Sequence, residues 1–407
     1  MCIRDSNLSV DGLGGWSLTI PVGNELSDGV YDVQVTATDS AGNASSIAGT
    51  GALTVDTTAP AAPVAPLDLA TLSDSGASDT DDITNESAPL LELVSSSAAP
   101  GTIVRIFADA TEIATTTLDA SGGFSVNSSV LSDGVHSISY RFEDALGNMS
   151  ASSPALAVTI DTVASVPVIT TPIMSDGLIS LAEESSVLIE GTTEADAEVE
   201  IQISDTSAGT VSTTVTSTSG GSWSNSASLL DVSTLIDGSL QVVATVTDLA
   251  GNTATSVAES VIYDPIAPTE PTVVAQTTNS TTPTLSGTLT LNPGDTFTVT
   301  VAGTEYSEGT NLTQDGVNWT LVIPAGAPLP EGDYEVVVTV MDAAGNSVSD
   351  TMINELIVDL TAPPDPSTTL DLIASSDTGT SDTDNLTNLT TIDVALPAIR
   401  QRVWRSR

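Results

Sequence analysis

The sequence predicts an all-β protein, an elongated array of tandem β-sandwich repeats. Two observations predict this fold class. Short strings recur in a fixed order along the chain, and apolar residues alternate with polar ones between them. At 407 residues, 40% of them hydrophobic, the chain is long enough for several domains and apolar enough to bury a core in each.

Four strings mark each repeat, always in the same order. The best defined is Asp-x-x-Gly-Asn, which begins at Asp39, Asp144, Asp248 and Asp342. Before it come the related strings LSDGVYDV, LSDGVHSI, LIDGSLQV and LPEGDYEV, and after it come VDTTAP, IDTVAS, YDPIAP and VDLTAP. The fourth string is an aromatic residue in a short strand, namely Trp16, Phe124, Trp223 and Trp319.

The strings divide the chain into complete and partial repeats. Complete repeats are expected at residues 57–161, 162–264 and 265–359. Residues 1–56 and 360–407 are expected to be partial repeats, in which residues 7–56 match the second half of a repeat and residues 360–394 match the first part of one. Residues 1–6 fit no repeat position, so we expect a cloning or sequencing artefact there. Arginines crowd residues 397–407, and two interpretations are open, a frameshifted read and a genuine basic tail.

Period-two alternation predicts the strands of each repeat. In GVHSISYRFED, the residues His136, Ile138, Tyr140 and Phe142 share the more apolar face, as expected for a half-buried strand. No helical period is evident, and Gly, Asp, Asn and Ser turns separate the segments. Short strands in units of about 100 residues are typical of an immunoglobulin-like sandwich.

The strings take structural roles in such a sandwich. LSDG predicts a tight turn, and Tyr31 and Tyr334 follow this turn as in a tyrosine corner, whose hydroxyl bonds back to the chain upstream. His136 keeps a polar tip there and Leu240 does not, so we expect His136 to be a strand residue rather than a catalyst. Asp-x-x-Gly-Asn predicts the turn between the last two strands, and the Pro-containing strings predict linkers. The four string aromatics are expected to pack in cores rather than to form a ligand platform.

Charge excludes several classes of partner. With 53 Asp and Glu against 7 Arg and no Lys, the formal net charge is −46, which excludes nucleic acid and disfavours an anionic membrane surface. The lack of Lys excludes a Lys–Asn isopeptide bond, and the only cysteine, Cys2, excludes an intrachain disulfide. The sequence has no apolar window long enough to insert into a membrane.

A longer block recurs as well. DLATLSDSGASDTDDITN runs over residues 68–85, and DLIASSDTGTSDTDNLTN runs over residues 371–388. This block, together with LSDGxY, DxAGN and VDTTAP, resembles the bacterial Ig-like tandem repeats of giant secreted adhesins and biofilm-associated surface proteins. The resemblance covers residues 7–394. It implies a secreted or cell-surface location in a bacterium, tandem arrays, and often calcium at repeat junctions. The repeats at 162–264 and 265–359 lack the block, which puts any ion site that needs it in doubt there.

Topology predicts where calcium could bind. The Asp that closes one repeat is expected to face the Asp-x-x-Gly-Asn turn of the next, because these segments lie at opposite poles of a sandwich. Calcium takes about six to eight oxygen ligands. Asp and Asn are also ordinary turn residues, so a purely structural role stays open. The candidate ligands are Asp56 with Asp144 and Asn148, Asp161 with Asp248 and Asn252, and Asp264 with Asp342 and Asn346.

The recurring block offers a second candidate cation site. Its carboxylates repel one another unless a cation or water screens them, and a solvated acidic loop is the alternative. The spacing is not that of an EF-hand, since the closing Glu is absent. The candidate residues are Asp74, Asp79, Asp81 and Asp82, with Asp377, Asp382 and Asp384 as their equivalents.

These patterns leave three functions open. The favoured one is a structural spacer, or stalk, of a large adhesin, whose partners are the neighbouring repeats and, through regions outside this chain, host or matrix glycans or proteins. The alternative is an adhesion module that binds glycan or protein, for which only the divergent segment Asn292–Val317 qualifies as a binding loop. A further alternative is an accessory region of a secreted hydrolase. No enzyme is expected, because each notable Asp recurs in repeat register, whereas a catalytic pair would occur once.

Overall fold

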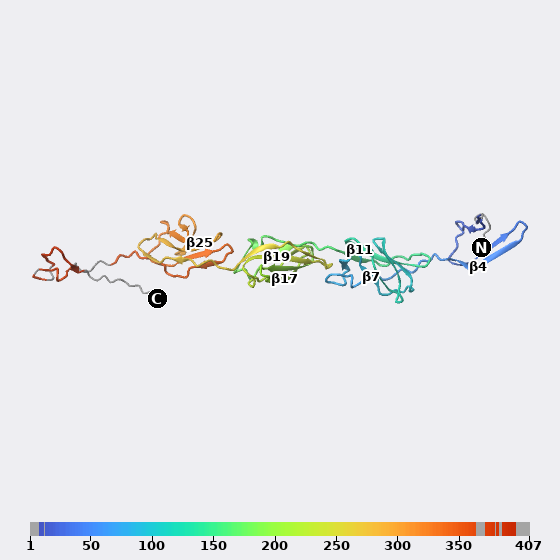
Figure 1. Ribbon diagram of the computed structural model, residues 1–407, viewed down its shortest axis with the longest axis horizontal. Helices are drawn as coiled ribbons and strands as arrows, with labels where there is room; N and C mark the ends of the chain where they lie inside the picture. The colour runs from blue at the N-terminus through green and yellow to red at the C-terminus, as the bar shows by residue number, and fades with distance from the viewer. Residues whose placement is uncertain (1–7, 12, 364–370, 379, 382–384, 396–407) are drawn as a thin grey trace. The chain divides into compact units, whose positions relative to one another are not determined.

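The chain forms separate all-β repeats (Figure 1). The computed structural model describes residues 8–11, 13–363, 371–378, 380–381 and 385–395. The chain divides into two compact units, Met1–Asp264 and Pro265–Arg407. The first unit contains the repeats at 57–161 and 162–264, and the second contains the repeat at 265–359.

The repeat at 57–161 is a sandwich of two sheets, whose strands β7 and β11 are labelled in Figure 1. One sheet has the order β10-β7-β5, and the other has the order β6-β12-β11-β8-β9. Inward side chains of both sheets, from Leu67 to Ile160, form one buried core. The strands are β5 (Asp68–Leu69), β6 (Ile83–Thr84), β7 (Leu90–Leu93), β8 (Ile103–Ala108), β9 (Thr111–Thr117), β10 (Phe124–Asn127), β11 (Gly134–Glu143) and β12 (Leu156–Ile160).

The repeat at 162–264 has the same plan. Its sheets have the orders β13-β15-β18 and β14-β21-β19-β16-β17, and β20 pairs with β19. A short 3-10 helix, η1 (Ile173–Ser175), precedes β14. The strands are β13 (Val168–Ile169), β14 (Leu178–Ser180), β15 (Glu190–Thr192), β16 (Glu198–Ser204), β17 (Thr210–Thr216), β18 (Ser222–Ser224), β19 (Gly238–Thr247), β20 (Thr253–Thr255) and β21 (Glu259–Asp264).

The repeat at 265–359 has sheets β22-β24-β28-β27, β23-β32-β29 and β26-β25-β30-β31. The segment Asn292–Val317, the candidate binding loop, is mostly paired strand, and its Phe297 lies in the core. The strands are β22 (Thr272–Val273), β23 (Gln276–Thr278), β24 (Thr284–Thr288), β25 (Thr296–Val301), β26 (Thr304–Ser307), β27 (Leu312–Asp315), β28 (Asn318–Val322), β29 (Gly332–Tyr334), β30 (Val336–Met341), β31 (Ser347–Ser349) and β32 (Leu356–Val358).

The first strand of each complete repeat is split between the two sheets. Its first half, β5, β13 or β22, pairs antiparallel with β7, β15 or β24. Its second half, β6, β14 or β23, pairs parallel with the last strand, β12, β21 or β32. We call the segment between the halves the crossover loop. It comprises residues 70–82, 170–177 and 274–275 in the three repeats, so the first copy of the recurring block contains the longest of these loops.

The prediction that the string aromatics pack in cores is right for three of the four. Phe124, Trp223 and Trp319 are 7%, 3% and 0% exposed, respectively. The prediction was wrong for Trp16, which is 48% exposed. Trp16 lies in the hairpin of β1 (Leu8–Val10) and β2 (Trp16–Leu18), and no described residue between 8 and 56 is buried. A hairpin alone has no second sheet to bury the indole.

The flanking partial repeats contain few strands. Residues 29–55 form one long hairpin of β3 (Gly29–Thr38) and β4 (Ala44–Val55), joined by the turn that starts at Asp39. Near the other end, β33 (Asp371–Leu372) pairs with β34 (Val394–Ala395).

The tyrosine-corner prediction is confirmed at atomic detail. The Tyr31 hydroxyl donates to the Ser27 carbonyl at 2.7 Å, and the Tyr334 hydroxyl donates to the Pro330 carbonyl at 3.0 Å. His136 forms the equivalent hydrogen bond to the chain upstream, since its Nε2 lies 2.8 Å from the Ser132 carbonyl oxygen. Its Nδ1 lies 2.8 Å from Asp109 Oδ2. These bonds raise the pKa of His136, first through Ser132 and then through Asp109.

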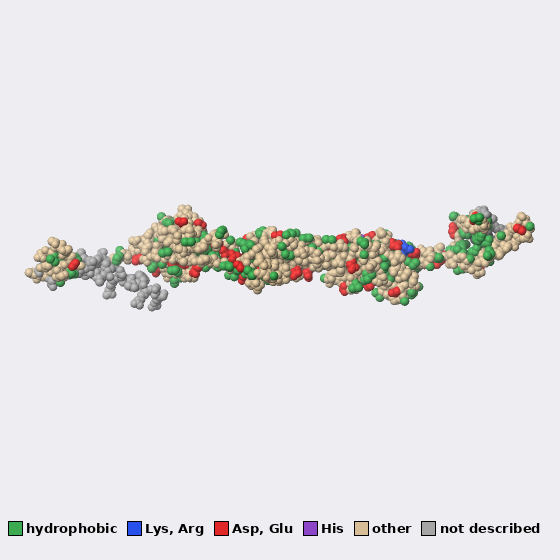
Figure 2. Space-filling model, in the orientation of Figure 1, with side chains coloured by type: hydrophobic (Ala, Val, Ile, Leu, Met, Phe, Trp, Pro, Cys, Tyr) green, Lys and Arg blue, Asp and Glu red, His purple; other side chains and the backbone are tan. Residues whose placement is uncertain are grey.

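Acidic side chains dominate the charged surface. On the face shown in Figure 2, they appear on every complete repeat, whereas basic side chains appear on the repeat at 57–161. In the described part of the chain, Arg105 pairs with Glu112 and Glu143, and His136 pairs with Asp109. Within those same residues, no helix has the length and apolar character that a membrane crossing needs.

Candidate metal centre at a repeat junction

The junction between the repeats at 57–161 and 162–264 brings two chain segments together through Asn252. The Asp248 carboxylate accepts from the Asn252 backbone N–H at 2.8 Å and from its Nδ2 at 2.8 Å, which closes the turn after β19. The same Nδ2 also donates to the carbonyl of Asp161, the residue that follows β12, at 2.8 Å. One amide group therefore joins the turn of one repeat to the end of the previous repeat.

The preceding junction has the same link. Asn148 Nδ2 donates to Asp144 Oδ2 at 2.8 Å and to the Asp56 carbonyl at 3.0 Å. In these two repeats, the turn thus meets the closing Asp of the previous repeat, as the topology predicts. In both asparagines, the side-chain nitrogen Nδ2 faces oxygens of Asp residues. The side-chain oxygen was the expected calcium ligand, and the amide group would have to rotate to bring that oxygen to the site.

Three carboxylates meet at the second junction. Oxygens of Asp161, Glu194 and Asp248 all lie within 4.8 Å of one another. Asp161 comes from one repeat, whereas Glu194, just after β15, and Asp248, just after β19, come from the next. Asp248 is only 6% exposed, and no salt bridge in the described residues reaches the three. We call these residues the junction triad.

The electrostatics of the junction triad favour a cation. Burial raises the pKa of Glu194, and the charges of Asp248 and Asp161 raise it further, although the Ser165 N–H donates to Glu194 Oε1 at 3.0 Å. A raised pKa shows that the negative charge on Glu194 is disfavoured at this position. A bound divalent cation would supply the missing positive charge, and carboxylate oxygens are the ligands that calcium prefers.

Sequence reasoning missed Glu194. It falls outside the four strings, and the corresponding stretch of the repeat at 57–161, residues 95–97, is Ser-Ser-Ser. The register supports this correspondence, because Phe124 pairs with Leu93 as Trp223 pairs with Gly191. A search for acidic residues that break the repeat pattern would have found it.

The remaining predicted junction residues belong to two different units. Asp264 closes the first unit, whereas Asp342 and Asn346 lie in the second. Within the second unit, the Asp342 carboxylate accepts from the Asn346 backbone N–H and Nδ2, each at 2.9 Å. This is the same turn as at Asp248.

The acidic loop of the recurring block buries one of its carboxylates. Asp74 is 7% exposed, and its Oδ1 has no hydrogen-bond partner among the described residues. Burial raises the pKa of Asp74, as do the charges of Asp81 and Asp82. The pKa of Asp82 is raised too, by burial and then by Asp68 and Asp81. Asp79 and Asp81 are exposed.

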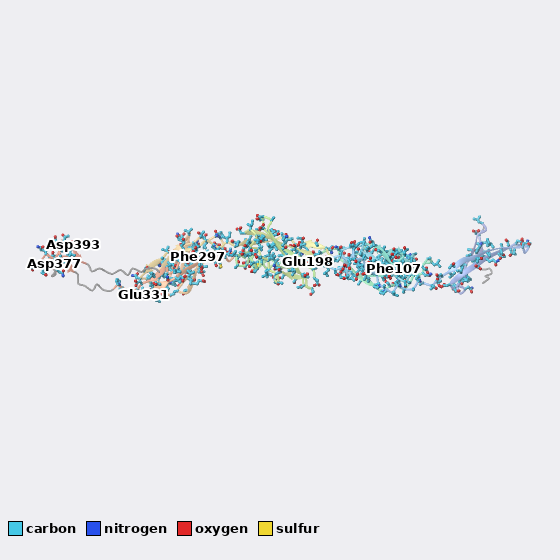
Figure 3. The ribbon with its side chains drawn as sticks, turned by 90° about the horizontal axis from the view of Figure 1, so that it is seen from below. Phe107, Glu198, Phe297, Glu331, Asp377 and Asp393 are labelled. Carbon is cyan, nitrogen blue, oxygen red and sulfur yellow. The ribbon has the colours of Figure 1, made fainter. Side chains whose placement is uncertain are left out.

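The second copy of the block repeats this arrangement. Asp377 is 5% exposed and also has an Oδ1 without a partner in the described part of the chain. Its neighbour Ser376 accepts from the Asp393 N–H at 2.8 Å, and Figure 3 shows Asp377 and Asp393 in the same loop. Asp382 and Asp384 lie outside the described residues.

The two predicted sites lie at the same pole of the repeat. The Asp82 carbonyl accepts from the Thr159 N–H, and the Thr84 carbonyl accepts from the Asp161 N–H, each at 2.9 Å. The acidic loop therefore runs into β6, which lies beside the last strand and its closing Asp161.

Comparison with known proteins identifies the family. The family model described as bacterial Ig-like domain matches residues 4–57, 60–162, 180–264 and 271–360. The chain therefore belongs to the bacterial Ig-like domain family, arranged as tandem repeats. No curated protein matches the sequence.

Solved structures of adhesin repeats are similar in fold. A calcium-stabilised adhesin that helps an Antarctic bacterium bind ice is 24% identical, covers 86% of this chain and 89% of its own, and has a TM-score of 0.35. A tetra-tandem repeat from the extending region of a large adhesion protein is 22% identical, with coverages of 86% and 90% and a TM-score of 0.28. A structure from a 1.5-MDa bacterial ice-binding adhesin is 21% identical, with coverages of 74% and 100% and a TM-score of 0.36.

Proposed function

We propose that this chain is a spacer segment of a large bacterial surface or secreted adhesin, without catalytic activity. Each of the three complete repeats builds a buried core from its strands, and the divergent segment Asn292–Val317 is mostly paired strand. The Asn links at both junctions of the first unit join successive repeats end to end. These observations support a role in carrying an adhesive region rather than in forming one.

A spacer must be extended in solution. We expect small-angle scattering of the chain to give a radius of gyration near ~43 Å, as for a rod of about 150 Å, against ~22 Å for a compact globule of this length. A value near the lower figure contradicts the spacer function.

We further propose that calcium binds at the junction triad and stiffens this junction. The observation that carries this proposal is the meeting of Asp161, Glu194 and Asp248 from two successive repeats within 4.8 Å. Asp161 would contribute a ligand from one side of the junction, and Glu194 and Asp248 would contribute ligands from the other. One ion would thus join the repeats while removing the repulsion among the three carboxylates.

Isothermal titration of the full chain with calcium in moderate salt tests this proposal. We expect a site with a Kd of about 10⁻⁴ to 10⁻³ M, the range of extracellular calcium modules, and weaker binding of magnesium. The variant Glu194→Gln should remove this site. Glu200→Gln is the matched control, because Glu200 is an exposed carboxylate of the same repeat in β16. If the parent and Glu194→Gln titrate identically, the junction triad is not the calcium site.

The acidic loop is a second, separate candidate within this proposal. The unpartnered Oδ1 atoms of Asp74 and Asp377 are suited to receive a cation in each copy of the block. Asp74→Asn should then remove a second binding event and leave the event at the junction triad unchanged. A titration that loses nothing in Asp74→Asn assigns the loop to solvent screening alone.

A further inference from the structure

The crossover loop at residues 70–82 touches the following repeat. Ser75 Oγ donates to the carbonyl of Ala250, in the turn after β19, at 2.5 Å. It also accepts from the backbone N–H of Asn85 at 2.8 Å. A Cβ atom on Gly76 would lie 2.0 Å from the Leu249 carbonyl oxygen, so only glycine allows the two backbones to approach this closely.

The partner turn also depends on a glycine at the contact. A Cβ on Gly251 would lie 3.1 Å from the backbone nitrogen of Gly76. Gly42 and Gly147 occupy the same turn position with the same positive φ, but a Cβ there meets nothing closer than 3.8 Å. The turn geometry explains glycine at all three positions, whereas the close approach is specific to Gly251.

The second copy of the block shows the loop with a different hydrogen-bond arrangement. Thr378 takes the place of Ser75, and Asn388 takes the place of Asn85. Thr378 Oγ1 again accepts from the backbone N–H of its Asn, at 3.0 Å, but its own proton goes to the Asn388 side-chain oxygen, at 2.9 Å. The hydroxyl thus has two alternative acceptors, its own Asn or the carbonyl of a neighbouring turn.

We infer that the Ser-Asp-Ser/Thr-Gly segment of the block is a docking surface for the Asp-x-x-Gly-Asn turn of a following repeat. On docking, the hydroxyl group rotates, so that it donates its hydrogen bond to a turn carbonyl instead of to the Asn of its own loop. The two glycines allow the backbones to come close. Ala250 is 1% exposed, as expected for the centre of a formed contact. The repeats at 162–264 and 265–359 lack the segment, so docking of this kind belongs to block-bearing repeats. The inference requires neither calcium nor the spacer function.

Distances between spin labels on neighbouring repeats test the docking. Cys2 is the only cysteine, so Cys2→Ser in the full chain allows labels at Thr117→Cys on β9 and Thr214→Cys on β17, both exposed positions. In chelator, we expect a narrow distribution for the parent. Gly76→Ala and Ser75→Ala should widen it about twofold, while Ser75→Thr, which keeps the hydroxyl, should leave it unchanged.

The control variant separates backbone strain from lost contact. Gly101 has a positive φ of 84° in the same repeat and open space around its Cβ position, so Gly101→Ala should not widen the distribution. Circular dichroism would establish that each variant retains its strands. The docking is refuted if Gly76→Ala leaves the distribution as narrow as the parent's.

Measurement in calcium distinguishes this inference from the calcium proposal. A parent distribution that is narrow only in calcium refutes docking by the loop and supports the ion. A distribution that is narrow in chelator, unchanged by calcium and widened by Gly76→Ala supports docking and refutes stiffening by the ion.

Discussion

Replacing Glu194 by Gln should change the stability of the repeat at 162–264 in opposite directions with and without calcium. In chelator, the three carboxylates of the junction triad lie within 4.8 Å of one another. Among the described residues, none of them forms a salt bridge with a basic side chain. Each pair of unit charges at that distance costs about 0.9 kcal/mol at the dielectric constant of water and about 3.5 kcal/mol at an effective value of 20. Glu194→Gln removes two of the three pairs. Because two of the three residues are only partly buried, the lower figure applies, and we expect a stabilisation of about 2 kcal/mol at neutral pH.

Calcium should reverse this order. At a free concentration a hundredfold above Kd, the ion stabilises the parent by about 2.7 kcal/mol. Glu194→Gln loses most of that gain, because one of three carboxylate ligands is gone. The parent should therefore become more stable than the variant on addition of calcium.

The pH dependence has a defined sign. The folded-state pKa of Glu194 is raised, so its contribution to stability is complete below the ordinary pKa of Glu and is lost as the pH rises through the folded-state value. In chelator, the parent should lose stability over that window relative to Glu194→Gln, and calcium should remove the difference.

Amide hydrogen exchange on peptides of β19 and β21 measures this repeat alone within the full chain. Equal protection of parent and variant in chelator, together with an equal response to calcium, would refute the electrostatic argument. Glu200→Gln should behave as the parent in both conditions.

Three further predictions concern the folds of the repeats. His136→Leu should be less stable than the parent at pH values below the folded-state pKa of His136 and about as stable as the parent above it, because a raised pKa means that protonation of His136 stabilises the fold. Thermal melts from about pH 5 to 8 measure this difference, and a difference that does not depend on pH would contradict the prediction. Trp319→Ala should cost about 3–5 kcal/mol because the indole is fully buried, whereas Trp16→Ala should cost under about 0.5 kcal/mol; denaturant titration with exchange readout separates the two, and similar costs would refute the assignment of cores. Gly191→Ala should cost about 1–3 kcal/mol, because its Cβ would lie 2.2 Å both from Trp223 Cζ2 and from the Val168 carbonyl oxygen; a melt identical to the parent's would contradict this close packing.

The sequence predicted the parts of the fold that recur. The turns at Asp144 and Asp248 and the period-two strands depend on local residues that are visible in one chain. The split first strand could not be predicted, because halves such as β5 and β6 are only two residues long and show no period. The position of the acidic loop could not be predicted either, because it depends on the pairing of β6 with β12.

Two of the three residues of the junction triad, Asp161 and Asp248, were predicted from the sequence, whereas Glu194 was not. The meeting of Asp161 with the turn at Asp248 follows from topology, which is shared by all repeats. Glu194 completes the junction triad but occurs in one repeat only, so a search for recurrence passes over it. Likewise, the contact of Gly76 with the next repeat depends on the length of one loop, which varies between repeats.

The parallel pairing of the split first strand with the last strand has a mechanical consequence. If the chain were pulled from its two ends, tension would enter each complete repeat through its first strand and leave through its last. The pairs β6–β12, β14–β21 and β23–β32 are each parallel. Pulling the two ends apart therefore slides the strands lengthwise, and the hydrogen bonds between them share the load together. An antiparallel pair that is pulled apart from one end would instead peel open, so that its hydrogen bonds break one after another. A repeat built in this way resists stretching at the strand pair that lies nearest the chain ends, and the rest of the sandwich stays folded until that pair yields.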